Sequence, residues 1–427
     1  MKKKSPLALA KKLFPICRSI TGDGVRRSLA MIRDLIPELE IVEVPSGTKC
    51  FDWIVPEEWN IIDAYIEDSK GKKIVSFHEC NLHVVSYSIP VDKFLSLKEL
   101  QKNLYSLPDK PDAIPYVMSY YKKHWGFCIQ ENLRKTLVDD TYHVVINSSL
   151  KNGSLTYGEV FLPATTRETS QEVFLSTYIC HPSLANNEIS GPVVTTFLID
   201  KLKKMKRNYS YRIIFIPETI GSIVYLSKHY LELKKNVVAG YNITCVGDDR
   251  TYSYLPSRNG DSLSDRIAKH VLNNVVRDYK QYSYLDRGSD ERQYCWPGID
   301  LPIATIMRTK YGEYDEYHTS LDNLSLLTET SLKDSISILY RCLVCIEENK
   351  KINVNTLCEP HLSKYNLYDS LNINRRSNNE SRIMLNILTY ADDRYLLDIA
   401  DIIGVPMWDL YKIKNTLLKN KLVTENF

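Results

Sequence analysis

The sequence predicts an α/β protein with a mainly parallel mixed sheet and helices on both faces, plus two smaller domains. A rhythm of strand, loop and helix runs from Glu172 to about Asn349, which is typical of a parallel sheet. Short β-rich stretches separated by Gly, Pro and Asn turns run from about Trp53 to Val160 and indicate an inserted β-domain. A length of 427 residues accommodates two or three such domains.

The main α/β domain is expected to span residues 1–52 and 161–355. Residues 5–37 predict two helices broken by the turn at 21–24, and residues 40–44 predict a short strand. From residue 172 onward, continuous apolar runs predict strands and amphipathic runs predict helices. The expected strands are 172–179, 211–217, 237–246 and 301–307, and the expected helices are 193–205, 222–235, 262–278 and 330–349.

The inserted domain is expected over residues 53–160, where it would cover a cleft of the main domain as a lid. Its predicted strands are 63–68, 72–78, 82–89, 142–150 and 154–162. The aromatic residues of IPYVMSYYKKHWGFC, at 114–128, could face that cleft, although packing inside the domain explains them as well.

Residues 375–427 predict a winged helix-turn-helix domain, preceded by a polar linker at 372–379. From Arg375 onward the tail has eight Lys and Arg against seven Asp and Glu, so it lacks the basic excess with which proteins neutralise DNA phosphates. A partner protein is therefore favoured slightly over DNA as the ligand of this domain.

The net charge of +3 is too small to indicate a nucleic-acid or membrane partner for the whole chain. The N-terminal residues contain no apolar run long enough for a signal peptide, and no segment has the roughly 18–20 apolar residues that span a bilayer. These observations predict a cytoplasmic protein with no membrane association, and they leave its oligomeric state open.

Polar residues that follow the predicted strands supply the candidate site, because the carboxyl ends of parallel strands meet at one edge of a sheet. His181 follows the first strand, Glu218 the second, Asp248 and Asp249 the third, and His318 the fourth. Imidazole and carboxylate groups are the ligands of a catalytic zinc site. A lone histidine after a strand is more often a surface residue, but two of them with intervening carboxylates make a metal site as good an explanation.

The segments STYICHPSLANNEISGP, IFIPETIGS, GSDERQYCWPGIDLPIATIM and EYHTSLDN resemble the zinc aminopeptidase superfamily, which also contains the glutaminyl cyclases. PSGTKCFDWIVPEEWNI and IPYVMSYYKKHWGFC further resemble a bacterial aminopeptidase-like group with an inserted β-domain and a C-terminal winged helix. That group is often linked to polysaccharide biosynthesis. The resemblance covers nearly the whole chain and implies a phosphorylase/hydrolase-like zinc peptidase core.

The resemblance also implies roles for individual residues. His181 and His318 match the first and last histidine ligands, Asn187 stands at the place of the metal-bridging aspartate, and Glu218 matches the general base that activates water. Two further carboxylates match supporting positions, namely Asp290 in the S-D segment and Asp322 after the last histidine.

Three departures from the family pattern argue against a two-zinc site. Asn187 is a neutral amide, Thr219 replaces a ligating Glu, and the family's middle aspartate aligns near Thr244 unless Asp248 or Asp249 substitutes for it. Neutral ligands hold divalent cations less tightly. One zinc ion is thus favoured over two, and over none, with His181, His318 and a carboxylate from Glu188 or Glu218 as ligands.

The leading hypothesis is a zinc-dependent hydrolase in which metal-activated water attacks an amide or acyl bond of a small peptide or acylated small molecule. A second hypothesis is cleavage or transfer of an acyl group on an amino-sugar precursor in polysaccharide biosynthesis. A third is a non-catalytic, ligand-binding regulator that acts through the winged helix.

Overall fold

The computed structural model describes residues 5–367 and 379–426, which divide into two compact units. One unit comprises residues 1–264 and 279–337, and the other comprises residues 265–278 and 338–427. The predicted linker at 372–379 lies outside the described residues except at its last position. Nothing in the described chain is a helix both long and apolar enough to cross a membrane.

The main domain is built on an eight-stranded sheet in the order β1-β10-β12-β11-β13-β16-β14-β15. Its four central strands, β12, β11, β13 and β16, are parallel. The pairs β1–β10, β10–β12 and β14–β16 are antiparallel, and β15 pairs parallel with β14. The strand bounds are β1 Glu40–Pro45, β10 Ser154–Leu162, β11 Glu172–Tyr178, β12 Ser210–Ile216, β13 Val237–Asn242, β14 Ser253–Leu255, β15 Lys280–Gln281 and β16 Ile303–Met307.

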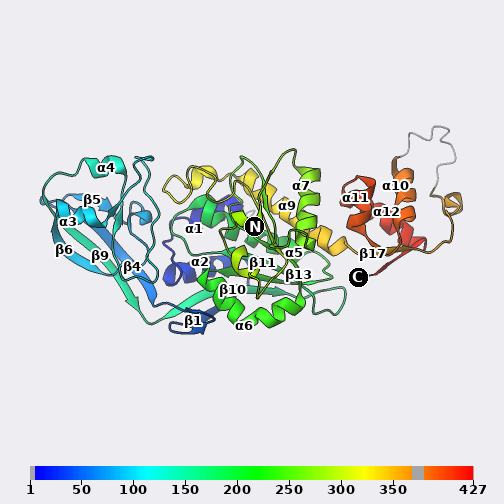
Figure 1. Ribbon diagram of the computed structural model, residues 1–427, viewed down its shortest axis with the longest axis horizontal. Coiled ribbons are helices and arrows are strands. Elements are labelled where there is room, and N and C mark those ends of the chain that lie inside the picture. The colour runs from blue at the N-terminus through cyan, green and yellow to red at the C-terminus, as the bar shows by residue number, and fades with distance from the viewer. Residues whose placement is uncertain (1–4, 368–378, 427) are drawn as a thin grey trace. The chain divides into compact units, whose positions relative to one another are not determined.

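Helices cover both faces of this sheet, with α6 on one side and α1 and α5 on the other (Figure 1). The central strands are buried along their whole length, which explains their continuous apolar sequences. The expected fold class is confirmed. The helices of this domain are α1 Pro6–Leu13, α2 Asp23–Arg33, α5 Ser190–Leu202, α6 Ile220–Asn236 and α8 Glu291–Tyr294; α7 Leu263–Val275 and α9 Glu329–Glu348 extend into the second unit.

The inserted domain is a four-stranded antiparallel sheet in the order β5-β4-β9-β6. The structure differs from the predicted boundary at residue 160, because β10 pairs with β1 and β12 of the main sheet. β10 alternates apolar and polar residues, a pattern that fits a strand of the main sheet as well as one of the inserted sheet. The sequence pattern alone therefore does not show to which sheet β10 belongs. The insertion contains β4 Glu58–Glu67, β5 Lys73–Ser76, β6 Val91–Ser96, α3 Leu97–Leu100, β7 Leu104–Tyr105, β8 Phe127–Cys128, α4 Glu131–Lys135 and β9 Thr141–Lys151, and the hairpin β2 Lys49–Cys50 and β3 Trp53–Ile54 precedes it.

In its described residues, the C-terminal domain contains the α-helices α10, α11 and α12 and a small antiparallel sheet in the order β18-β17-β19. Gly404 ends the first helix of the helix-turn-helix with a φ of 74°, a backbone conformation that favours glycine. Its first strand begins at Lys351, so the domain starts well before the predicted residue 375. Its elements are β17 Lys351–Val354, α10 Asn379–Tyr390, β18 Arg394–Tyr395, α11 Leu396–Ile403, α12 Met407–Lys419 and β19 Val423–Asn426.

Candidate metal centre

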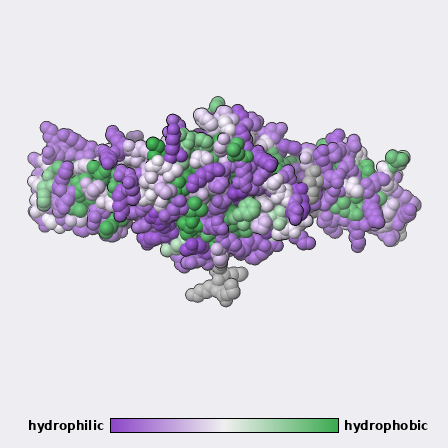
Figure 2. Space-filling view, turned by 90° about the horizontal axis from the view of Figure 1, so that it is seen from below, coloured by the Kyte–Doolittle hydropathy of each residue, from purple (hydrophilic) through white to green (hydrophobic). Residues whose placement is uncertain are grey.

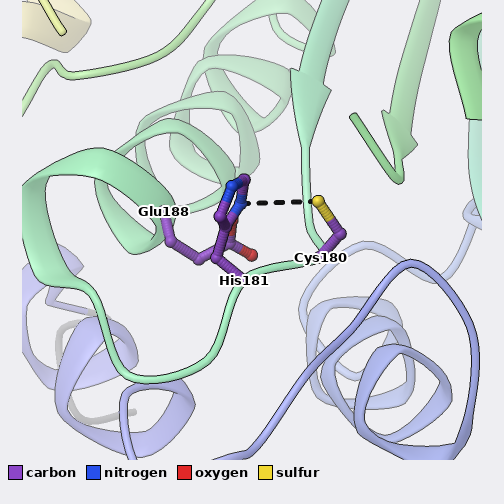
Figure 3. Close-up of side chains that lie close together, drawn as sticks. All are labelled: Cys180, His181 and Glu188. Carbon is purple, nitrogen blue, oxygen red and sulfur yellow. Dashed lines mark hydrogen bonds and ion pairs between the residues drawn. The ribbon is translucent and has the colours of Figure 1, made fainter. Parts of the chain in front are cut away.

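His181 lies three residues beyond the end of β11, where the chain turns away from the sheet. Its Nδ1 is 2.8 Å from Oε2 of Glu188, which belongs to a π-helical turn over Ala185–Ile189, and 3.4 Å from Sγ of Cys180 (Figure 3). The other Glu188 oxygen accepts a hydrogen bond from Nε of Arg18 at 3.2 Å, and both side chains are fully buried. With Nδ1 donating to a carboxylate, Nε2 is the nitrogen left to bind a metal.

The surroundings of His181 favour a positive charge at Nε2. Oε2 of Glu218 lies 3.7 Å from Nε2, at the opposite edge of the ring from Glu188. Burial opposes protonation of the ring, but its contacts with Cys180, Tyr116 and Glu188 outweigh burial and raise the pKa of His181 well above its usual value. The same electrostatics would favour a metal cation at this nitrogen.

His318 lies on the loop after β16, with its ring centroid 5.7 Å from that of His181. Its backbone is left-handed, with φ at 54°, and its ring stacks on Tyr317 at 3.9 Å. The backbone N–H of Tyr116, from the inserted domain, donates to its carbonyl at 2.8 Å. Burial and the nearby His181 lower the pKa of His318 to about 3, so its ring is neutral and keeps a lone pair for a metal.

Glu218 follows β12 with its side chain 21% exposed, and its charge acts on the buried Asp290, which precedes α8. Oδ1 of Asp290 accepts hydrogen bonds from the N–H of Thr219 at 2.7 Å and the hydroxyl of Ser222 at 2.8 Å. Burial raises the pKa of Glu218, and burial together with the charge of Glu218 raises that of Asp290 to about 7. Two carboxyls that resist ionising together can hold one proton between them near neutral pH.

Asn187 presents a buried oxygen without a hydrogen-bond partner in the described part of the chain. The hydroxyl of Tyr178 donates to the backbone carbonyl of Asn187 at 2.8 Å, so it must accept from the side-chain Nδ2 at 2.7 Å. This arrangement leaves Oδ1 free. A buried oxygen without a hydrogen-bond partner is what a neutral metal ligand can offer.

Asp322 holds the π-helical turn in place. Its oxygens accept hydrogen bonds from the N–H groups of Ala185, Asn186 and Asn187 at 2.6–3.1 Å and from the hydroxyl of Tyr314 at 2.9 Å. Burial nevertheless raises its pKa to about 6. Asp322 therefore acts on the site through the backbone that carries Asn187 and Glu188.

The carboxylate of Asp248 is engaged away from the histidines. It accepts from Nδ2 of Asn186, from the N–H and hydroxyl of Thr309 and from the N–H of Arg250, at 2.8–3.0 Å. The hydroxyl of Thr244, at the place of the family's middle aspartate, donates to Tyr178 instead. Neither residue offers a free oxygen to a second cation.

A cavity of about 330 Å³ opens over His181, Glu218 and His318. These three residues were predicted from the sequence as site residues, but most of the other residues that line the cavity were not. The aromatic residues at 114–128 were the one sequence feature that indicated that the inserted domain lines the cavity. The segments GSDER and FDW each contain one further lining residue, Arg292 and Trp53. The remaining lining residues are Ile20, Trp53, Met118, Tyr120, Tyr121, Cys180, Thr219, Ile220 and Arg292.

Cys180, His181 and Glu188 are close enough together, within 4.8 Å, to be a metal-binding group of the described chain. However, Arg18 already neutralises Glu188, and burial raises the pKa of Cys180 to about 11, which keeps its sulfur a neutral thiol. Both also contact Nδ1, the nitrogen that donates. This triad is thus better suited to orienting His181 than to holding the ion itself.

Comparisons with known proteins agree with this architecture. Residues 7–349 match a family described as a domain of unknown function, DUF4910, and residues 350–425 match a winged helix-turn-helix family. A Clostridium acetobutylicum protein, provisionally named a polysaccharide biosynthesis protein with an aminopeptidase-like domain, is 46% identical over 92% of this chain and 89% of its own.

Two solved structures define the fold further. A provisionally assigned peptidase from Clostridium acetobutylicum superposes with a TM-score of 0.92 at 43% identity, over 99% of this chain and 96% of that chain. A zinc aminopeptidase from Bacillus subtilis superposes with a TM-score of 0.58 at 12% identity, over 79% and 93% of the two chains. The resemblance seen in the sequence is confirmed: the chain belongs to the DUF4910 family, and it has an aminopeptidase-like fold followed by a winged helix.

Proposed function

We propose that this protein is a hydrolase of amide or acyl bonds that uses one zinc ion, bound by His181 and His318. The observation that carries the proposal is the free Nε2 of His181, which lies 3.7 Å from Oε2 of Glu218 in the cavity shared with His318. A carboxylate beside the nitrogen that would hold the ion is placed to accept a proton from water there.

The residues present fit one ion better than two. His181, His318 and Oδ1 of Asn187 would hold it, with His181 releasing the Nε2 proton that its raised pKa favours. Thr219 cannot replace a ligating glutamate, and Asp248 and Thr244 are engaged in other hydrogen bonds. A zinc ion bound here would polarise the carbonyl of the scissile bond and lower the pKa of water.

Glu218 is the residue suited to carry the proton. Burial raises the pKa of its carboxyl, so Glu218 can take a proton from water and pass it to the leaving nitrogen or oxygen. Arg292 lines the same cavity and donates to the Thr219 hydroxyl, which places a guanidinium where a substrate carbonyl or carboxylate would lie. Tyr120 and Tyr121 from the insertion narrow the cavity and limit the entry of water.

Two substrate classes follow from the relatives. The aminopeptidase fold favours a small peptide, whereas the name of the Clostridium acetobutylicum relative favours an acyl group on an amino sugar. Turnover of aminoacyl amides against N-acyl amino sugars distinguishes them. Location in the cytoplasm remains a prediction.

The test is the variant His318→Ala beside His78→Ala, a histidine of the insertion whose side chain is 68% exposed. The proposal predicts that His318→Ala loses both bound zinc and hydrolysis, whereas His78→Ala keeps both. Unchanged hydrolysis in His318→Ala would refute it.

A further inference from the structure

An apolar groove of about 570 Å³ lies beside the candidate site, a size typical of small-molecule pockets. Its walls come from the β2–β3 hairpin, one face of α6, and α8 with the turn that follows it. Asp52 is the one charged side chain in its lining. The residues lining this apolar groove are Phe51, Asp52, Trp53, Ile223, Leu226, Tyr230, Gln293, Trp296, Gly298 and Ile299.

Large aromatic side chains are held exposed around the groove. Phe51, Trp53 and Trp296 are 48%, 39% and 60% exposed. Phe51 has a φ of 55°, a conformation that costs a non-glycine residue about 1–3 kcal/mol, and its ring packs edge-on against Tyr230 at 5.7 Å. From the side of α6, the main domain shows hydrophobic residues gathered in a band among hydrophilic ones (Figure 2). Exposed apolar patches of this kind mark binding sites.

The groove adjoins the candidate catalytic cavity. Trp53 lines both. Along α6, Ile220 faces the cavity while Ile223 and Tyr230, on the same helical face, line the groove. Along α8, Arg292 lines the cavity and the next residue, Gln293, lines the groove. A molecule whose reacting bond lies at His181 can therefore extend into the groove without leaving the protein.

We propose that the groove binds a neutral, apolar group of the substrate, such as a medium-length acyl chain, while the scissile amide lies in the cavity. This inference rests on the proposed function and adds a substrate class to it: amides with a polar head and an apolar tail. The apolar walls select a hydrophobic tail, and the carboxylate of Asp52 repels an anionic one.

The experiment measures binding separately from turnover. N-acetyl-, N-butanoyl- and N-octanoylglucosamine are titrated calorimetrically into the full chain carrying Glu218→Gln, and hydrolysis of the same compounds is followed in the unaltered chain. The proposal predicts that affinity rises by up to about fourfold for each methylene that enters the groove. Trp296→Ala should weaken octanoyl binding by about fivefold or more. The matched control is Phe161→Ala, which removes an aromatic side chain that is 47% exposed on β10, and this variant should bind the octanoyl compound as tightly as the unsubstituted groove does.

Affinity that is independent of chain length, or equal effects of Trp296→Ala and Phe161→Ala, would overturn the groove as a substrate site. So would a dimer that Trp296→Ala converts to a monomer, because the groove would then be an interface between two copies. Length-dependent binding without hydrolysis of either these sugars or aminoacyl amides would support the groove and refute the proposed function. Hydrolysis of short amides with no preference for longer ones would refute the groove as a substrate site and support the proposed function.

Discussion

At the scale of single residues, the site depends on two carboxyls that cannot both ionise easily. Burial raises the pKa of Glu218, and burial together with the charge of Glu218 raises the pKa of Asp290. Oδ2 of Asp290 has no hydrogen-bond partner in the part of the chain that the structure describes. A proton on either carboxyl removes the repulsion between the two negative charges, and Glu218 can exchange its proton with water.

Replacing Glu218 by glutamine should abolish this proton transfer while leaving the histidines in place. Glu218→Gln is predicted to lower kcat by about 100-fold or more, because general acid–base catalysis contributes about 10²–10⁴-fold. Zinc content should be retained. Steady-state kinetics with elemental analysis check both, and zinc lost together with activity would show that Glu218 is instead a ligand.

The raised pKa of Asp290 also affects stability. Its folded pKa of about 7 lies above the ordinary value of 3.8, so between these values the folded state binds more protons than the unfolded state. The contribution of Asp290 to the free energy of unfolding therefore falls as pH rises from about 4 to 7, by at most about 1.4 kcal/mol per pH unit. Asp290→Asn is predicted to remove this slope. Urea unfolding across that range tests it, and parallel pH profiles for the two proteins would contradict it.

At the scale of elements, Arg18 connects the segment between α1 and α2 to the His181 loop. Besides Glu188, its guanidinium donates to the carbonyls of Leu13 and Pro182. Arg18→Ala would leave the Glu188 carboxylate buried without its cation, and is predicted to lower the free energy of unfolding by about 3–5 kcal/mol. The control is Arg258→Ala, which breaks a solvent-screened pair with Asp300 and should lower the free energy of unfolding far less. Equal effects in urea unfolding would contradict this role.

The central strands and helices were predictable because each has a single dominant pattern. The strands at β11, β12, β13 and β16 are continuous apolar runs, and strand ends then placed His181, Glu218 and His318 at one edge. Arg18 was not predictable, because its partner Glu188 is 170 residues away. Asp248 was predicted as a ligand from the same rule, but the structure engages it with Asn186 and Thr309. Strand ends identify an edge of the sheet, not the direction in which each side chain points.

At the scale of the whole molecule, the winged helix is the part whose partner is undetermined. Two of the three lysines of its last helix are paired: Lys412 contacts Glu380, and the buried Lys414 contacts Glu348 and Glu425. These pairs leave little positive charge on that helix for DNA phosphates, which favours a protein partner over DNA.

The full chain is therefore predicted to show no salt-sensitive binding to duplex DNA at physiological salt. Fluorescence anisotropy with a labelled duplex at several salt concentrations is the measurement. The full chain is required, because the fragment 375–427 lacks β17, the central strand of the domain's sheet. A dissociation constant well below about 10⁻⁶ M that weakens steeply with salt would instead support a DNA-binding regulator.

The metal content of the purified protein decides whether His181 and His318 form a zinc site. Protein purified without chelators, and its His181→Ala variant, are supplied with zinc, desalted and measured by elemental analysis. About one zinc ion per chain is expected in the unaltered protein and none in the variant. No zinc in either protein, or the same amount in both, would contradict a metal centre at His181 and His318.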